Sequence, residues 1–131
     1  MDTRRLRRLL IALALAAPWH PTDAGRLRVL VQTAPLAGFE FHEGSRLWPQ
    51  LQVGDVLELR REPANRHDTR AIAVRWRGEM LGYLPRAEND AVSEAMDRGV
   101  TAEARIAALR DERDPWRRVQ VEVFLVMPRT Q

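Results

Sequence analysis

Residues that could act as nucleophiles are scarce in this sequence. It contains no cysteine, which excludes thiolate nucleophiles, disulfides and thiolate zinc sites. Its two serines, Ser45 and Ser93, stand in neither a nucleophile-elbow nor a Ser-x-x-Lys context. The sequence therefore predicts a protein that is not an enzyme and that needs no cofactor.

Some acidic and imidazole groups are close enough in sequence to suggest a metal or an acid–base site. Glu40, His42 and Glu43 form a small cluster, but exposed polar residues at the tip of a strand explain it more simply. His42, His67 and Asp68 would bind zinc only if the fold made them converge, because zinc takes several protein ligands. We therefore predict no metal site.

Aromatic and arginine side chains occur together in the charged segment 110–118, RDERDPWRR. A tryptophan exposed beside arginines suits either a protein partner or a nucleic-acid strand. A tryptophan folded back onto the sheet would instead be structural. We predict Trp116, Arg117 and Arg118 as secondary binding residues and keep the structural alternative open.

Short strands must position these side chains. Branched and alternating apolar residues predict strands at residues 26–33, 56–61, 71–76, 80–84, 101–109 and 119–127. A short extended segment is predicted at 39–42, one helical turn at 45–51 and one longer helix at 87–98. In that helix one apolar face is expected, made by Ala87, Ala91, Val92, Ala95 and Met96. Strand 119–127 should turn its odd-numbered residues to one side, from Val119 to Met127.

These elements predict a mainly β fold with one α-helix. About six short strands with close turns favour a small, partly closed β-barrel of the OB or SH3-like kind. The 131 residues leave room for one such domain. Binding is expected at the loops on one rim of the barrel.

The first 24 residues have the three-part pattern of a secretory signal. Residues 4–8 are cationic, residues 9–17 are apolar without interruption, and small residues permit cleavage after Ala16 or Ala24. The apolar run is shorter than the roughly 20 residues that span a bilayer. We expect a cleaved signal peptide at 1–24, one domain at 25–131, export to the periplasm and no stable membrane span. An uncleaved anchor is one alternative, and a wrongly assigned start codon, which would leave the protein cytoplasmic, is another.

All 21 basic residues are arginine, yet the net charge is only +3. Loss of residues 1–24 would remove four arginines and two aspartates and leave a net charge of +1. A nearly neutral domain does not by itself indicate nucleic-acid binding. Arginine does favour planar contacts with phosphate or carboxylate.

Three segments of the chain carry recognisable motifs, which follow one another in a fixed order along the sequence. They are PLAGF at 35–39 leading to Phe41, LRREPANRHD at 59–68 with AIAV at 71–74, and LGYLPR at 81–86. Pro63 and Asn65 shape a turn, and Asp68 can accept backbone N–H groups where the loop returns to the sheet. On these motifs the chain resembles the HIRAN domain family, from about Leu30 to Ile106.

The resemblance implies an OB-like module that holds the 3′ end of single-stranded DNA. HIRAN domains occur beside DNA-remodelling helicase domains and also alone in bacteria. By motif position, Phe41 would stack on the terminal base, and His67 and Asp68 match an aromatic–Asp pair whose carboxylate meets the 3′-hydroxyl. Tyr83 and Arg86 match two polar positions before the helix, where a guanidinium would meet a phosphate. For Asp68 a loop-capping role, and for Arg86 a solvated surface position, are the alternatives.

Two functions of different classes follow from this sequence. The first is a non-catalytic module that binds single-stranded nucleic acid or its 3′ end through Phe41, His67, Asp68, Tyr83 and Arg86. The second is an exported envelope module that binds a protein, a peptide or an anionic polymer on the same rim. The family resemblance favours the first function, whereas the leader and the small net charge favour the second.

Overall fold

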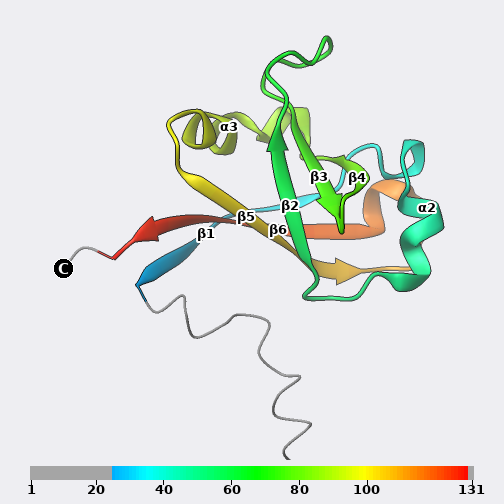
Figure 1. The fold of residues 1–131 in the computed structure, drawn as a ribbon. Helices are drawn as coiled ribbons and strands as arrows, with labels where there is room; N and C mark the ends of the chain where they lie inside the picture. The colour runs from blue at the N-terminus through cyan, green and yellow to red at the C-terminus, as the bar shows by residue number, and fades with distance from the viewer. Residues whose placement is uncertain (1–24, 130–131) are drawn as a thin grey trace, which may run out of the picture.

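Six antiparallel strands form one sheet in the computed structural model, which describes residues 25–129 (Figure 1). The strand order is β1-β6-β5-β2-β3-β4. The strands are β1 (Arg26–Pro35), β2 (Val56–Arg61), β3 (Ile72–Trp76), β4 (Glu79–Tyr83), β5 (Thr101–Leu109) and β6 (Val119–Pro128). The predicted mainly β fold is confirmed, and the predicted signal peptide lies outside the described residues.

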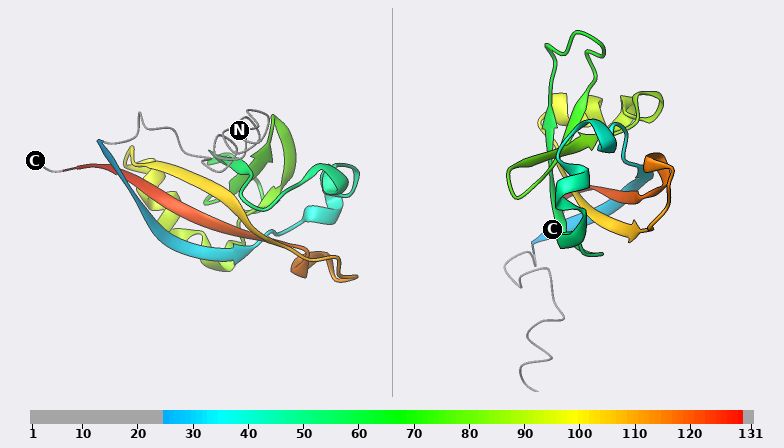
Figure 2. Two further views of the ribbon diagram at one scale, coloured as in Figure 1. Left: turned by 90° about the horizontal axis from the view of Figure 1, so that it is seen from below. Right: turned by 90° about the vertical axis from the view of Figure 1, so that its right-hand side faces the viewer.

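The sheet curls into a partly closed barrel. β1, β6 and β5 run side by side as long curved strands (Figure 2). β2 turns the corner, because Val56 and Leu57 pair with β5 while residues 58–61 pair with β3. No ladder joins the two edge strands β1 and β4.

A single bridge links those edges. Just after β1, Ala37 pairs with Tyr83 of β4, and their backbone N–H and C=O groups exchange two hydrogen bonds of 2.9 Å. A Cβ added to Gly82 would lie 2.3 Å from the carbonyl oxygen of Ala37 and 3.2 Å from Leu36 Cγ. Glycine is therefore needed for this close approach. The bridge brings the first and third sequence motifs together.

Alternating apolar side chains from the strands fill the barrel. The largest fully buried side chains include Leu36, Phe39, Leu57, Ile72, Val74, Leu81, Leu84, Ile106, Val119, Val121 and Val123. Trp76 is also buried in this cluster. Among the described residues the buried apolar side chains run from Ala34 to Val126.

The helical segments differ from the prediction in their limits. The helix expected at 87–98 is α3 (Asp90–Asp97), and residues 86–88 before it form the 3-10 turn η4 (Arg86–Glu88). Val92 is buried and Met96 packs on the core, but Ala87 and Ala91 are exposed. Alanine is too small to fix which side of a helix is buried, and Pro85 with its following turn delays the start of α3.

Two shorter helical segments follow β1. The extended segment expected at 39–42 is instead the 3-10 turn η2 (Phe39–Phe41). The helical turn expected at 45–51 is present as α2 (Gly44–Leu47) followed by η3 (Trp48–Gln50). Within residues 25–129, no helix has the length and apolar character needed to cross a membrane.

The alternation of β6 is confirmed for only part of the strand. Val119, Val121 and Val123 are buried as predicted, whereas Met127 is 42% exposed. Toward the end of β6, Phe124 and Val126 are buried instead. The guanidinium of Arg105 lies 5.0 Å from the centre of the Phe124 ring and helps to cover that face.

Candidate functional site

One open pocket of about 570 Å³ collects residues from all three sequence motifs. It is lined by Ala37, Phe41, His42, Asn65, His67, Asp68, Ala71, Tyr83, Leu84 and Arg86. All five primary site residues predicted from the sequence are among them. We refer to this site as the Phe41 pocket.

The turn η2 presents Phe41 to the solvent. Gly38 precedes it in the left-handed conformation, with φ 71°. Phe39 is 1% exposed and its ring lies where a Cβ on Gly44 would clash, at 2.4 Å. Phe39 thus anchors the turn in the core, while Phe41 is 80% exposed and offers an aromatic face at the pocket.

The loop between β2 and β3 is ordered by Asn65. Its Oδ1 accepts the backbone N–H groups of His67 at 2.9 Å and Asp68 at 3.1 Å. Its Nδ2 donates to Glu62 Oε1 at 3.1 Å. An asparagine that binds its own loop in this way replaces a backbone turn, and it places His67 and Asp68 at the pocket.

Tyr83 binds the same carboxylate oxygen of Glu62 as Asn65 does. Its hydroxyl donates to Glu62 Oε1 at 2.8 Å. Burial and this hydrogen bond to Glu62 raise the pKa of Tyr83 above its usual value of 10.0. The His42 ring meets the Tyr83 ring edge-on, with centres 5.8 Å apart. Tyr83 is therefore a neutral, fixed wall of the pocket.

Asp68 accepts two hydrogen bonds. Its Oδ1 accepts the Arg70 backbone N–H at 2.9 Å, and its Oδ2 accepts Asn89 Nδ2 at 2.7 Å. Burial alone would raise the pKa of Asp68, but these two bonds and the charges of Arg86 and Arg70 outweigh it and lower the pKa below 3.8. The loop-capping role is thus observed. A carboxylate has about four acceptor positions, so capacity for a ligand remains.

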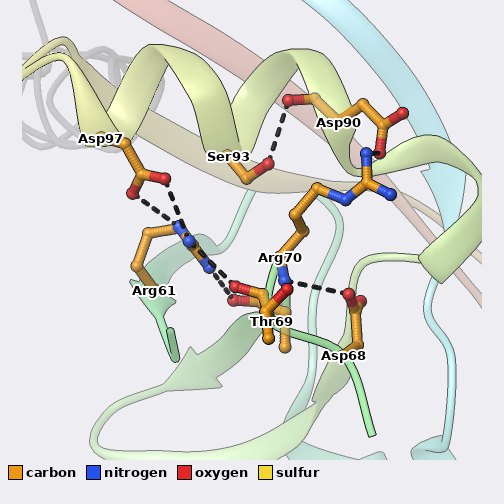
Figure 3. Close-up of polar contacts among 8 residues, drawn as sticks. Arg61, Asp68, Thr69, Arg70, Asp90, Ser93 and Asp97 are labelled. Atoms are coloured by element: carbon orange, nitrogen blue, oxygen red, sulfur yellow. Dashed lines mark hydrogen bonds and ion pairs between the residues drawn. The ribbon is translucent and has the colours of Figure 1, made fainter. Parts of the chain in front are cut away.

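Arg61 joins this loop to α3, as Figure 3 shows. Its guanidinium makes two hydrogen bonds to Asp97, of 2.8 and 3.0 Å, and donates to the carbonyl oxygens of Ala71 and Thr69. The hydrogen bond from Arg61 lowers the pKa of Asp97. A second ion pair joins Arg70 to Asp90 at 2.6 Å.

Arg86 supplies a cation at the edge of the Phe41 pocket. It is exposed and forms no ion pair or hydrogen bond with residues 25–129. Its charge nevertheless acts on Asp68 and lowers the pKa of that carboxyl. A guanidinium with unused donors beside an aromatic face is able to bind a phosphate group.

The secondary residues do not join this pocket. Trp116, 48% exposed, and Arg117 line a separate pocket of about 310 Å³ together with Arg110. The guanidinium of Arg118 lies 4.1 Å from the centre of the Trp48 ring, and Arg118 also pairs with Asp111 at 3.6 Å. Arg118 is therefore packed against Trp48, whereas Trp116 and Arg117 are exposed.

The sequence prediction omitted several residues that the structure places at or behind the pocket. Asn65 and Arg61 belong to the second motif, so their positions were visible but their hydrogen bonds were not. Asn89, which binds Asp68, carried no signal in the sequence. Across residues 25–129, no group of three or more His, Asp or Glu side chains is arranged to hold a metal ion.

Comparison with known proteins places this geometry in a family. The HIRAN domain model matches residues 29–128. A crystal structure of a protein from Lactobacillus plantarum is similar, with a TM-score of 0.69 and 24% identity, over 78% of this chain and 98% of that one. The HIRAN domain of human HLTF superposes with a TM-score of 0.63 and 17% identity, over 81% of this chain and 83% of that one. None of the curated proteins matches the sequence. Since the family model covers most of the chain, the protein belongs to the HIRAN domain family.

Proposed function

We propose that this domain binds the 3′ end of single-stranded DNA in the Phe41 pocket. Membership of the HIRAN family and likeness to the HLTF domain support a nucleic-acid-binding module. The observation that carries the finer proposal is the lining of the pocket. An exposed aromatic ring, a carboxylate and an arginine that makes no ion pair among residues 25–129 meet in one open site.

Each of these groups suits one part of a terminal nucleotide. A base would stack on Phe41, since stacking on an exposed aromatic side chain contributes roughly 1–3 kcal/mol for any base. Arg86 would bind a backbone phosphate near the end of the strand. Asp68, kept ionised, would accept a hydrogen bond from the terminal 3′-hydroxyl. His67 and Tyr83 would shape the pocket around the sugar.

Asp68 also accounts for a preference among strand ends. A terminal 3′-phosphate would bring negative charge against an ionised carboxylate that is already held by the loop, and like charges at short range are unfavourable. A free hydroxyl has no such penalty and donates a proton to the hydrogen bond. The domain should therefore prefer strands that end in a hydroxyl.

The proposed activity is binding without catalysis. Ser93 is buried and its hydroxyl donates to the Asp90 carbonyl oxygen at 2.9 Å. Ser45 lies on α2 and does not line the Phe41 pocket. The pocket thus offers no serine nucleophile to a bound strand.

The place where the domain acts is a separate proposal. The cationic and apolar pattern of residues 4–17 supports export, which would place the mature domain outside the cytoplasm.

A strand that leaves the Phe41 pocket could continue along the pocket of Trp116 and Arg117, since η5 (Pro115–Arg117) lies against η2. If the domain binds no nucleic acid, a peptide or an anionic polymer becomes the ligand to test on this rim.

Binding assays with residues 25–131 test the proposed function. The described residues of this segment include the buried apolar cluster, and a similar fold covers 98% of the Lactobacillus plantarum chain, which supports the use of this segment alone. Phe41→Ala should weaken binding of a labelled oligonucleotide in fluorescence anisotropy by roughly 5- to 150-fold. Val53→Ala, which removes another exposed apolar side chain, is the matched control and should leave affinity unchanged. Equal affinity of the Phe41 variant and the parent domain would refute a stacking role.

A further inference from the structure

Asn89 is one of the two buried polar residues among residues 25–129, with 0% exposure. It stands where η4 ends and α3 begins. Asparagine at the start of a helix ordinarily accepts an N–H group from the first helical turn, but the Asn89 side chain makes no such capping bond. Its Nδ2 donates instead to Asp68 Oδ2 at 2.7 Å.

The side-chain oxygen of Asn89 indicates that stability alone does not explain why an asparagine stands at this position. Its Oδ1 is buried and has no hydrogen-bond partner within the described part of the chain. A buried carbonyl oxygen without a partner is destabilising, and a small apolar side chain would avoid that cost. The gain from an amide at this position therefore comes from its N–H group, which binds Asp68.

That hydrogen bond orients a pocket carboxylate. Asp68 lines the Phe41 pocket and is held on one oxygen by the Arg70 backbone and on the other by Asn89. The charged groups that act on Asp68 belong to Arg61, Arg70 and Arg86. The side chains of Arg70 and Arg86 are long and exposed, so they add positive potential without fixing direction. The plane of the carboxylate is fixed by the Arg70 backbone N–H group on one oxygen and by the buried Asn89 amide on the other.

We infer that Asn89 is a positioning residue for strand-end recognition. By holding the Asp68 carboxylate in one orientation, it lets Asp68 accept a terminal hydroxyl and disfavour a terminal phosphate. This role rests on the proposed function of the Phe41 pocket. Asn89 itself does not line the pocket, so it acts through Asp68 and not through contact with the strand.

The affinity ratio between 3′-hydroxyl and 3′-phosphate oligonucleotides is the direct test. Asn89→Ala should reduce this ratio by about fivefold or more, since hydrogen bonds to charged groups are among the stronger ones. Asn89→Asp, which keeps the size of the side chain but replaces the N–H donor with a second carboxylate, should also reduce it, because two carboxylates at this distance share a proton and the donor to Asp68 is lost. Ser93→Ala is the matched control, because Ser93 is buried on the same helix and binds Asp90 instead of Asp68.

A second measurement needs no nucleic acid. Carbon-detected NMR titration of the Asp68 carboxyl should show a higher pKa in Asn89→Ala than in the parent domain, because a bond to the charged form is lost. Ser93→Ala should leave that pKa in place. A fall in melting temperature without change in the Asp68 titration would show that Asn89 is only structural.

The outcomes separate this inference from the proposed function. If the parent domain prefers hydroxyl ends and Asn89→Ala retains the full preference, the positioning role is wrong while the proposed function stands. If the parent domain binds neither oligonucleotide, the proposed function fails, and end recognition through Asn89 fails with it. Loss of preference in both Asn89 variants, but not in Ser93→Ala, supports the role.

Discussion

Asp68 has one observed role, in closing the β2–β3 loop, and one proposed role, in binding a terminal hydroxyl, and its hydrogen bonds leave room for both. Its carboxylate closes the β2–β3 loop through the Arg70 backbone and reaches α3 through Asn89. Those two bonds use about half of its acceptor capacity. The same bonds lower its pKa and so keep the charge that a hydroxyl ligand needs. The observed structural role of Asp68 is therefore compatible with its proposed role as a ligand-binding residue.

The lowered pKa of Asp68 predicts how stability changes with pH. Its pKa is lower in the folded than in the unfolded chain, so its contribution is complete above pH 3.8 and is lost as the pH falls through the folded value. We expect the melting temperature to fall as the pH is lowered below about 4. Asp68→Asn should remove part of this fall at a cost of about 1 kcal/mol near neutral pH.

Thermal unfolding followed by circular dichroism at a series of pH values measures this effect. Glu112→Gln, which neutralises an exposed carboxylate in the segment 110–118, is the control and should leave the pH profile unchanged. A profile that is the same for Asp68→Asn and the parent domain would contradict the assigned hydrogen bonds.

The sequence identified five of the residues that line the pocket but not the side chains that hold them in place. Phe41, His67, Asp68, Tyr83 and Arg86 were found by motif position, and all of them line one pocket. The partner of Asp68 was not found, because Asn89 lies 21 positions away and its buried amide leaves no periodic pattern.

Among the elements, the bridge between Ala37 and Tyr83 decides the shape of the pocket. It joins the segment after β1 to β4 and so brings Phe41 beside Tyr83 and Arg86. The bridge itself has two backbone hydrogen bonds, and one more joins the Glu43 N–H group to the Met80 carbonyl oxygen of β4 at 3.0 Å. The close packing over Gly82 therefore carries much of the connection.

Gly82→Ala should open this link. The added Cβ would lie 2.3 Å from the carbonyl oxygen of Ala37, which is backbone and cannot turn away. Overpacking of this kind costs roughly 1–3 kcal/mol, and displacement of Tyr83 should also weaken nucleic-acid binding. Chemical denaturation measures the loss of stability. Gly25→Ala, which meets no atom within 4 Å, is the control; equal destabilisation by both would contradict the packing argument.

The strands were predictable from alternation, whereas the segment at 39–42 was not. In an extended segment Phe39 and Phe41 would share a face. In the 3-10 turn, with three residues per turn, the two side chains point in different directions. Phe39 is therefore 1% exposed and Phe41 is 80% exposed. The pattern Phe-Glu-Phe fits both conformations. The turn is favoured by the left-handed backbone of Gly38, which is a local effect, and by the space that Gly44 leaves for the Phe39 ring, whose burial is a tertiary effect.

The whole molecule carries little net charge for a nucleic-acid-binding protein. Residues 25–131 have a net charge of +1, and many arginines are paired, as in Arg61–Asp97, Arg70–Asp90 and Arg105–Glu122. Affinity should therefore come more from stacking and end recognition than from phosphate contacts. Such a domain differs from proteins that bind long strands mainly through contacts between basic side chains and phosphates.

Weak salt dependence is the corresponding prediction. With one to three phosphate contacts, the logarithm of affinity should fall against the logarithm of salt concentration with a slope of about −1 to −2. Arg86→Ala should reduce the magnitude of the slope by about 0.7. Arg77→Ala, at the turn at the opposite end of β3, should not change it. A slope several times steeper would contradict a pocket that binds only a strand end.

The most direct test of the central claim compares two forms of one oligonucleotide with the unmodified domain. Residues 25–131 would be titrated by fluorescence anisotropy against single strands of the same sequence that end in a 3′-hydroxyl or a 3′-phosphate. We predict tighter binding of the hydroxyl form at low and at moderate salt. Equal affinity for both forms, or no binding at low salt, would contradict recognition of the strand end in the Phe41 pocket.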